Sequence, residues 1–128
     1  MKKKILIVIA DYYKNISLNL MKSAKSEIKN FYNFKTITVP GVFEIPVTIS
    51  KNIDKYNGFI ALGCVIKGQT PHFNFISKAT TDSIMRLATE SKKPIGNGII
   101  TCLNMKQAIN RKNKGKEAAR ALISVLSQ

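Results

Sequence analysis

The sequence has no tryptophan, one histidine (His72) and only two cysteines, Cys64 and Cys102, among its 128 residues. Both cysteines lie in apolar, strand-like runs without the spacing of metal ligands, so we expect buried, reduced thiols and no metal site. Long hydrophobic runs are also missing. The apolar stretch at 4–10 is too short for a membrane helix, and no small-residue cleavage site follows it. We therefore expect a cytoplasmic protein with no membrane partner, formed by one domain over residues 1–128.

Acidic residues are scarce: seven Asp and Glu stand against 21 Lys and Arg, which gives a formal net charge of +14. Such an excess raises the question of nucleic-acid binding, because clustered cations displace counterions from phosphate backbones. Only Arg86, Arg111 and Arg120 are arginines, however, and no basic stripe interleaved with aromatic residues is present. We expect nonspecific adhesion to polyanions and no specific nucleic-acid partner.

What the chain does have is an alternation of strand-like and helix-like segments. Runs rich in β-branched residues predict strands at 4–10, 35–40, 58–67 and 95–102. Apolar residues four apart, from Ile16 to Ile28, mark a helix after the first strand, and further helices are predicted at 43–53, 71–91, 105–111 and 116–126. This order predicts an α/β fold with a four-stranded parallel sheet between two helical layers. Ligands of such sheets bind at the carboxyl ends of the strands.

The loop after the third strand, within GCVIKGQTPHF at 63–73, has the features of an anion site. Thr70 and Pro71 have the pattern of an N-cap and a first helical residue, and Gly68 permits a tight turn. Backbone amides at that helix start could hold a phosphate, with His72 in the first helical turn as a proton-transfer group. A capped helix whose histidine is merely a polar surface residue is the alternative, and this stretch alone leaves both open.

Three other loops at the same edge carry candidates. Glu44, in PGVFEIP at 40–46, could cap a helix or accept hydrogen bonds from a polyhydroxylated ligand. Tyr12 or Tyr13 could stack on a flat heterocycle. Arg111, in NRKNKGKEAA at 110–119, could aim a guanidinium at a phosphate, or the turn could be solvated basic surface.

Taken together, PGVFEIP, ALGCVIKGQTPHF, GNGIITCLNMKQAINR and NKGKEAA resemble, in this order and at these separations, the 6,7-dimethyl-8-ribityllumazine synthase family of riboflavin biosynthesis. The resemblance implies a three-layer flavodoxin-like sandwich and a homopentamer, which in some members forms a sixty-subunit shell, with active sites at subunit interfaces. It also implies association with riboflavin synthase. The implied reaction condenses 5-amino-6-(D-ribitylamino)uracil with 3,4-dihydroxy-2-butanone 4-phosphate and needs no metal or organic cofactor.

The resemblance also implies a role for particular residues. His72 matches the proton-transfer histidine, and the butanone phosphate would be held by Gln69, Thr70, Arg111 and Lys114, with Arg111 supplied across a subunit boundary. Tyr12 matches the aromatic residue that stacks on the pyrimidine, and Asn97 falls where a neighbouring subunit closes the site. The remaining pocket for the ribitylaminouracil would be lined by Val42, Phe43, Glu44, Cys64, Val65 and Ile66.

The sequence departs from the family pattern at two of these loops. Asp11, Tyr12 and Tyr13 stand where Arg-Phe-Asn is usual, and only Lys112 separates Arg111 from Asn113, where several more residues are common. These departures motivate an alternative, a catalytically weak homologue that binds a flavin or a riboflavin precursor.

Overall fold

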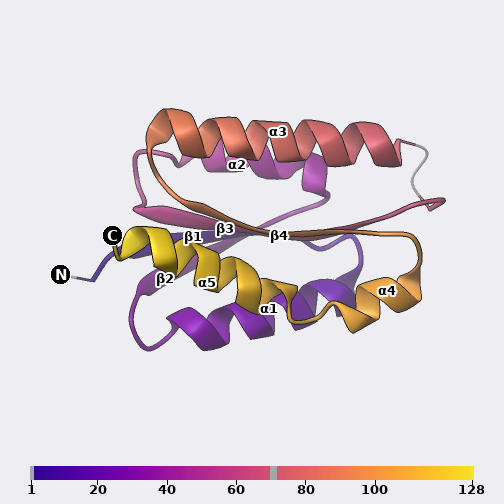
Figure 1. Cartoon of the computed structure of the whole chain (residues 1–128), viewed down its shortest axis with the longest axis horizontal. Coiled ribbons are helices and arrows are strands. Elements are labelled where there is room, and N and C mark those ends of the chain that lie inside the picture. The colour runs from indigo at the N-terminus through magenta and orange to yellow at the C-terminus, as the bar shows by residue number, and fades with distance from the viewer. Residues whose placement is uncertain (1, 70–71) are drawn as a thin grey trace.

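The structure, a computed structural model that describes residues 2–69 and 72–128, is built around a four-stranded sheet (Figure 1). The strands are β1 (Lys4–Ala10), β2 (Asn33–Val39), β3 (Gly58–Ile66) and β4 (Ile95–Cys102). Their order is β2-β1-β3-β4, and each neighbouring pair is parallel. The predicted parallel sheet is therefore confirmed, and each strand begins and ends within two residues of its expected limits.

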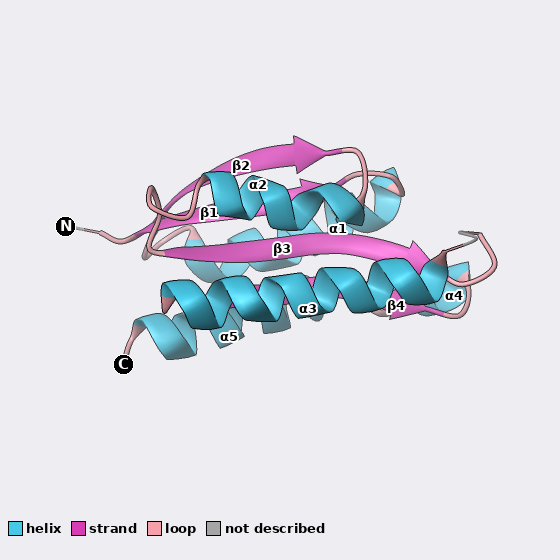
Figure 2. Ribbon diagram, turned by 90° about the horizontal axis from the view of Figure 1, so that it is seen from above, coloured by secondary structure: helices cyan, strands magenta, loops and turns pink. Residues whose placement is uncertain are grey.

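Helices cover both faces of the sheet, which completes the expected three layers of an α/β sandwich. In Figure 1, α2 and α3 lie above the sheet and α1, α4 and α5 lie below it; Figure 2 shows α2 and α3 from above. The helical segments are α1 (Lys14–Ile28), a 3-10 turn η1 (Val42–Glu44), α2 (Ile45–Lys51), α3 (Phe73–Ser91), α4 (Met105–Asn110) and α5 (Lys114–Leu126). None of the helices in the described ranges is long and apolar enough to cross a membrane.

Three helix starts differ from the sequence prediction, and one of them is α5, which begins at Lys114, two residues before the expected start at 116. The helix expected from 43 begins as η1, because the Glu44 carboxylate binds the Gly41 amide and tightens the first turn, and α2 then ends at Lys51. The helix expected from 71 begins at Phe73, since the Ile76 amide donates to the carbonyl of His72 and makes His72 the N-cap. Helix ends commonly shift by one or two residues in this way.

Strand β3 is the centre of the core, and all nine of its residues are buried, as its continuous apolar sequence predicted. Successive side chains point to opposite faces, so Cys64 and Ile66 pack in the lower core with α1 and α5, whereas Val65 packs in the upper core with α2. Both cysteines are buried and free, which confirms the expectation from their sequence surroundings.

The lower layer is held close to the sheet by small residues. The predicted apolar face of α1 is buried from Ile16 to Ile28. At Gly96 on β4, an added Cβ atom would overlap with the backbone carbonyl of Ala118 on α5. This close approach sets the position of the α5 axis relative to β4. It therefore also positions the turn that precedes α5 at the carboxyl edge of the sheet.

Candidate active site

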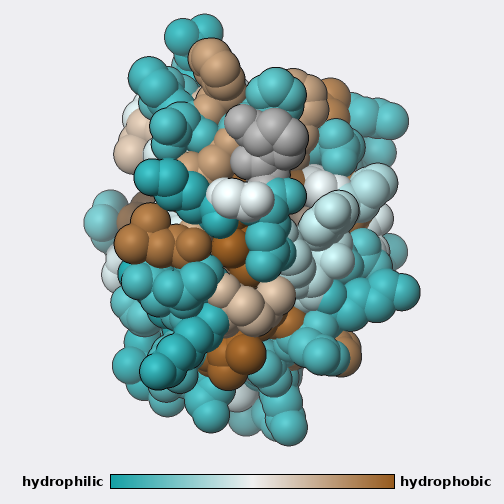
Figure 3. All heavy atoms as spheres, turned by 90° about the vertical axis from the view of Figure 1, so that its right-hand side faces the viewer, coloured by the Kyte–Doolittle hydropathy of each residue, from teal (hydrophilic) through white to brown (hydrophobic). Residues whose placement is uncertain are grey.

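The carboxyl ends of the strands form one edge of the molecule, at the right of Figure 1. Figure 3 looks onto this edge and shows apolar side chains (brown) gathered among polar ones. Exposed aromatic rings of Phe43 and Phe75 belong to the loop and helix at this edge, with 66% and 78% of each residue exposed. Single exposed apolar rings are common on protein surfaces, so these two indicate binding or assembly only together with a hollow at the same edge.

A hollow of about 270 Å³ opens at this edge between the ends of β1 and β3. Its lining comes from the loop after β1, from η1, from the end of β3 and the loop that follows, and from α3. The lining residues are Tyr12, Tyr13, Gly41, Val42, Phe43, Cys64, Val65, Gln69 and Ile76. Six predicted site residues are therefore brought together in it: Tyr12, Val42, Phe43, Cys64, Val65 and Gln69.

The two tyrosines of the first loop take different positions. Tyr12 is 70% exposed at the hollow, whereas Tyr13 is half-buried and packs against the lower core. Their rings meet edge to face, with centroids 4.9 Å apart and an interplanar angle of 77°. Ser17 donates a 2.6 Å hydrogen bond to the carbonyl of Ala10, which ties the start of α1 to the end of β1. Of the two rings, that of Tyr12 has the more exposed surface for stacking on a flat ligand.

The wall formed by η1 rests on β3 at Gly63. A Cβ atom there would lie 2.6 Å from Cγ1 of Val42, so only glycine lets η1 approach so closely. Within η1, Oε1 of Glu44 accepts a hydrogen bond from the Gly41 amide at 3.0 Å. The structure therefore gives Glu44 the capping role considered from the sequence. Its predicted contact with ribityl hydroxyls would use the remaining carboxylate oxygen.

The histidine lies beside this hollow and outside its lining. His72 is exposed, and its ring centroid is 6.5 Å from that of Phe75. Its expected position inside the first helical turn is wrong, because His72 is the N-cap and α3 begins one residue later. Gly68 has a φ of 84°, as the predicted tight turn requires. The predicted capping pair, Thr70 and Pro71, lies outside the described residues.

Arg111 and Lys114 line a second hollow, of about 460 Å³, under the end of β4. Its lining residues are Ile99, Ile100, Thr101, Asn110, Arg111, Asn113, Lys114 and Glu117. Nη1 of Arg111 donates to the carbonyl oxygen of Thr101 at 2.9 Å and lies 3.9 Å from Sγ of Cys102. The two hollows share no lining residue. Within one chain, Arg111 and Lys114 thus lie apart from Gln69 and from the residues predicted for the pyrimidine.

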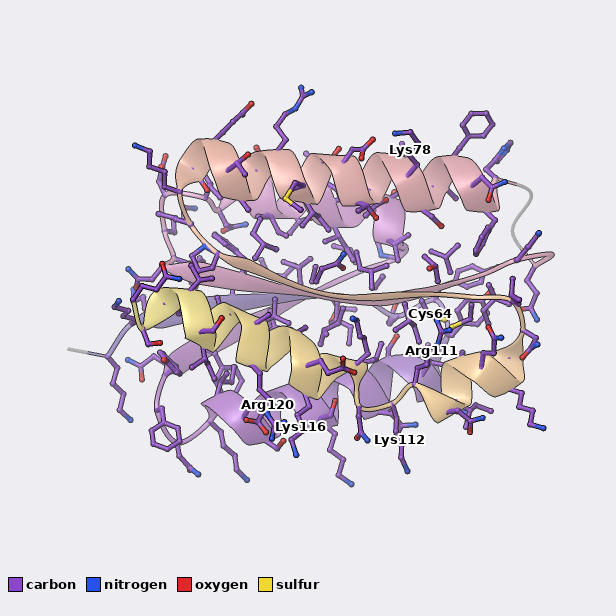
Figure 4. The ribbon with its side chains drawn as sticks, in the orientation of Figure 1. Cys64, Lys78, Arg111, Lys112, Lys116 and Arg120 are labelled. Atoms are coloured by element: carbon purple, nitrogen blue, oxygen red, sulfur yellow. The ribbon has the colours of Figure 1, made fainter. Side chains whose placement is uncertain are left out.

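The thiol of Cys64 belongs to the lining of the first hollow, and that of Cys102 lies 3.9 Å from Arg111 of the second; Figure 4 labels Cys64 and Arg111 below the sheet. Burial raises the pKa of Cys64 to about 12, and the neighbouring Cys102 adds to this shift. Burial also raises the pKa of Cys102, although the Arg111 guanidinium opposes the shift. Both thiols are therefore protonated at neutral pH, and neither supplies a nucleophile. Within residues 2–69 and 72–128, no group of three or more His, Cys, Asp or Glu could hold a metal ion.

Two further predicted residues stay outside both hollows. Ile66 is fully buried in the lower core, on the opposite face of β3 from Val65. Asn97 lies on β4 opposite Ala61, where its Oδ1 accepts a hydrogen bond from the Ile99 amide at 3.0 Å.

Gly41 and Ile76 line the first hollow and were not predicted. Ile76 stands four residues after His72, and that helical spacing was the available signal.

The chain is similar to one protein family over nearly its whole length. The family described as 6,7-dimethyl-8-ribityllumazine synthase matches residues 2–128. A protein of that name from Bartonella tribocorum is 41% identical, with 99% of this chain and 91% of the relative covered. Another, from Agrobacterium fabrum, is 38% identical, with 98% and 93% covered.

A solved structure described as a split gene transketolase, an inactive β4 tetramer, aligns over 99% of this chain and 40% of its own. The TM-score is 0.54 at 9% sequence identity, so the likeness concerns the fold alone. The two relatives carry more weight than this structure, because they are 41% and 38% identical and 91% and 93% of their own lengths are covered. On these grounds the chain belongs to the 6,7-dimethyl-8-ribityllumazine synthase family.

Proposed function

We propose that the protein condenses 5-amino-6-(D-ribitylamino)uracil with 3,4-dihydroxy-2-butanone 4-phosphate to give 6,7-dimethyl-8-ribityllumazine, phosphate and water. The observation that carries the proposal is the hollow of about 270 Å³, where the loop after β1, η1 and the end of β3 bring Tyr12, Phe43 and Cys64 to one place. An aromatic ring at the mouth and an apolar floor suit a flat pyrimidine. In the proposal, the pyrimidine stacks on Tyr12 and its ribityl chain lies along η1 towards Glu44.

The chemistry proposed for this site needs protons moved and an anion held, and it needs no strong nucleophile from the protein. The amine of the pyrimidine attacks the ketone and forms an imine with loss of one water, phosphate is eliminated, and ring closure with loss of a second water gives the lumazine. His72 is the proposed proton-transfer group, and Gln69, Thr70, Arg111 and Lys114 are the proposed phosphate ligands. Most of the acceleration would come from holding both substrates together, since well-oriented reactants reach effective molarities on the order of 10⁵ M or more.

A site made by two copies of the chain is part of the proposal. Arg111 and Lys114 lie in a different hollow from Tyr12 and Gln69, so one copy by itself does not place these two cations beside the pyrimidine wall. The exposed rings of Phe43 and Phe75 at the same edge support a contact with a second copy. We propose a homopentamer in which Arg111, Lys114 and Asn97 of one copy complete the hollow of its neighbour. The proposed location is the cytoplasm, with which two free thiols accord.

An assay of product formation tests the proposal. The purified protein is incubated with both substrates, and lumazine is followed by its absorbance and fluorescence. Binding of the pyrimidine without turnover at any substrate concentration would refute the catalytic part. Sedimentation velocity tests the assembly separately, and a monomer at working concentration would refute the shared site.

A further inference from the structure

The turn between α4 and α5 is fastened to α1, an element far away in the sequence. Oγ of Ser23 donates to the carbonyl oxygen of Lys112 at 3.0 Å across 89 residues of chain. Lys112 stands between Arg111 and Lys114, the two cations that line the hollow of about 460 Å³. The hydrogen bond from Ser23 therefore holds the backbone on which both cations are carried.

The helices meet very closely beside this bond. At Gly115, in the first turn of α5, an added Cβ atom would overlap with the carbonyl oxygen of Leu20 on α1. The Ser23 hydroxyl is also 3.0 Å from that Leu20 oxygen, so its single proton is shared between a carbonyl of its own helix and one of the turn. Glu27 pairs with Lys116 and Arg120, which lie further along α5 (Figure 4).

The turn needs such a tie because of its charge. Arg111, Lys112 and Lys114 place three cations within four residues, and their mutual repulsion favours open conformations of an exposed turn. When the turn is already held in one conformation, a phosphate that binds to it does not have to order the turn. The entropic cost of binding is then lower and the affinity is higher. The Arg111 guanidinium is restrained separately by its bond to the carbonyl of Thr101.

We propose that Ser23 is a positioning residue for the phosphate-bearing substrate and acts through the Arg111–Lys114 turn. The inference rests on the proposed function, which assigns the phosphate to these cations. Since a single hydrogen bond has a modest net effect, we expect Ser23→Ala to raise KM for the butanone phosphate roughly three- to tenfold. The KM for the pyrimidine and kcat should each stay within about twofold.

The matched control is Ser26→Ala, on the same helix. The Ser26 hydroxyl donates to the Ser23 carbonyl within α1 at 2.7 Å, and Ser26 is exposed. We expect wild-type constants for this variant. If Ser23→Ala behaves like Ser26→Ala, or raises both KM values together, the inference is wrong.

A double-mutant cycle tests whether Ser23 acts through Arg111. Arg111→Ala should raise KM for the butanone phosphate, and adding Ser23→Ala to it should change that KM less than it does in the wild-type chain. Full additivity would overturn the proposed route. No effect of Arg111→Ala would overturn both the phosphate assignment and the role of Ser23.

Binding of inorganic phosphate gives a readout that does not depend on turnover. Isothermal titration calorimetry of the intact protein should show weaker phosphate binding in Ser23→Ala than in Ser26→Ala. If the protein forms no lumazine but this difference remains, the proposed function fails and the role of Ser23 stands. If lumazine forms normally and the difference is absent, the role of Ser23 fails and the proposed function stands.

Discussion

Nη1 of Arg111 donates a 2.9 Å hydrogen bond to the carbonyl oxygen of Thr101, so the guanidinium is held at the end of β4. Two of its five N–H groups are used, one by the Thr101 carbonyl and one by the Cys102 sulfur, which leaves donors for an anion in the second hollow. This arrangement bears on the shortened turn noted in the sequence. The turn is brief, yet Arg111 and Lys114 still line one hollow of about 460 Å³.

Arg111→Lys tests whether the planar guanidinium is needed there. Lysine keeps the charge, but its ammonium cannot hold the Thr101 carbonyl and bind a phosphate bidentately at once. We expect KM for the butanone phosphate to rise about tenfold, the equivalent of about 1.4 kcal/mol, in steady-state kinetics. Lys112→Arg is the control, because Lys112 does not line the hollow. Equal constants for Arg111→Lys and wild type would show that charge alone suffices.

The sequence predicted the sheet well because its strands are continuous apolar runs bounded by polar segments. GFIALGCVI at 58–66 is buried along its whole length, as a strand covered on both faces must be. The start of α3 was predicted less well, because the Thr70–Pro71 pattern indicates a cap, while the hydrogen bond that begins the helix depends on the path of the loop.

The sequence predicted which residues belong to the candidate site, but not that they would lie in two separate hollows. Tyr12, Phe43 and Cys64 follow or end neighbouring strands, so the parallel topology brings them together. The separation of Arg111 from that hollow depends on which face of the sheet each loop turns towards. The contact between Ser23 and Lys112 depends on how closely α1 and α5 pack, which no local pattern reports.

His72→Ala tests the proton-transfer role proposed for the exposed histidine at the start of α3. General acid–base groups contribute roughly 10²- to 10⁴-fold, so kcat should fall within that range. Binding of the pyrimidine, measured by fluorescence titration, should stay near the wild-type value because His72 lies outside the lining of the first hollow. A kcat within threefold of wild type would assign the histidine to the polar surface instead.

Alkylation tests the protonation state of Cys64, whose pKa burial raises to about 12 from the usual 9.0. At pH 8 the thiolate fraction is then roughly a thousandfold below that of a free cysteine. We expect iodoacetamide to label Cys64 correspondingly slowly, as followed by mass spectrometry, and free cysteine in the same buffer is the control. Rapid labelling of the native protein would mean that the thiol is exposed and ionised.

The same pKa shift predicts how stability changes at high pH. The folded pKa of Cys64 is above the unfolded value, so above about pH 9 the unfolded chain has lost a proton that the folded chain keeps. The contribution of the protonated Cys64 thiol to the free energy of unfolding is fully present below pH 9 and is lost as the pH rises towards 12. Lysines titrate in the same range, so urea unfolding of Cys64→Ala provides the comparison. The difference in free energy of unfolding between wild type and this variant should decrease between pH 8.5 and pH 10. The size of the decrease should be on the order of that expected for one titrating thiol.

Gly96→Ala tests the close packing of α5 on β4 that carries the Arg111–Lys114 turn to the edge of the sheet. The new methyl group would meet the backbone carbonyl of Ala118, which cannot rotate away as a side chain would, so α5 has to shift. Overpacking of this kind lowers the free energy of unfolding by about 1–3 kcal/mol, measurable by urea titration. Ala121→Ser, on the exposed face of α5, should stay within about 0.5 kcal/mol of wild type. Because a shift of α5 also moves the turn, Gly96→Ala should bind inorganic phosphate more weakly as well as unfold more easily. Lower stability with unchanged phosphate binding would show that the turn is positioned independently of α5.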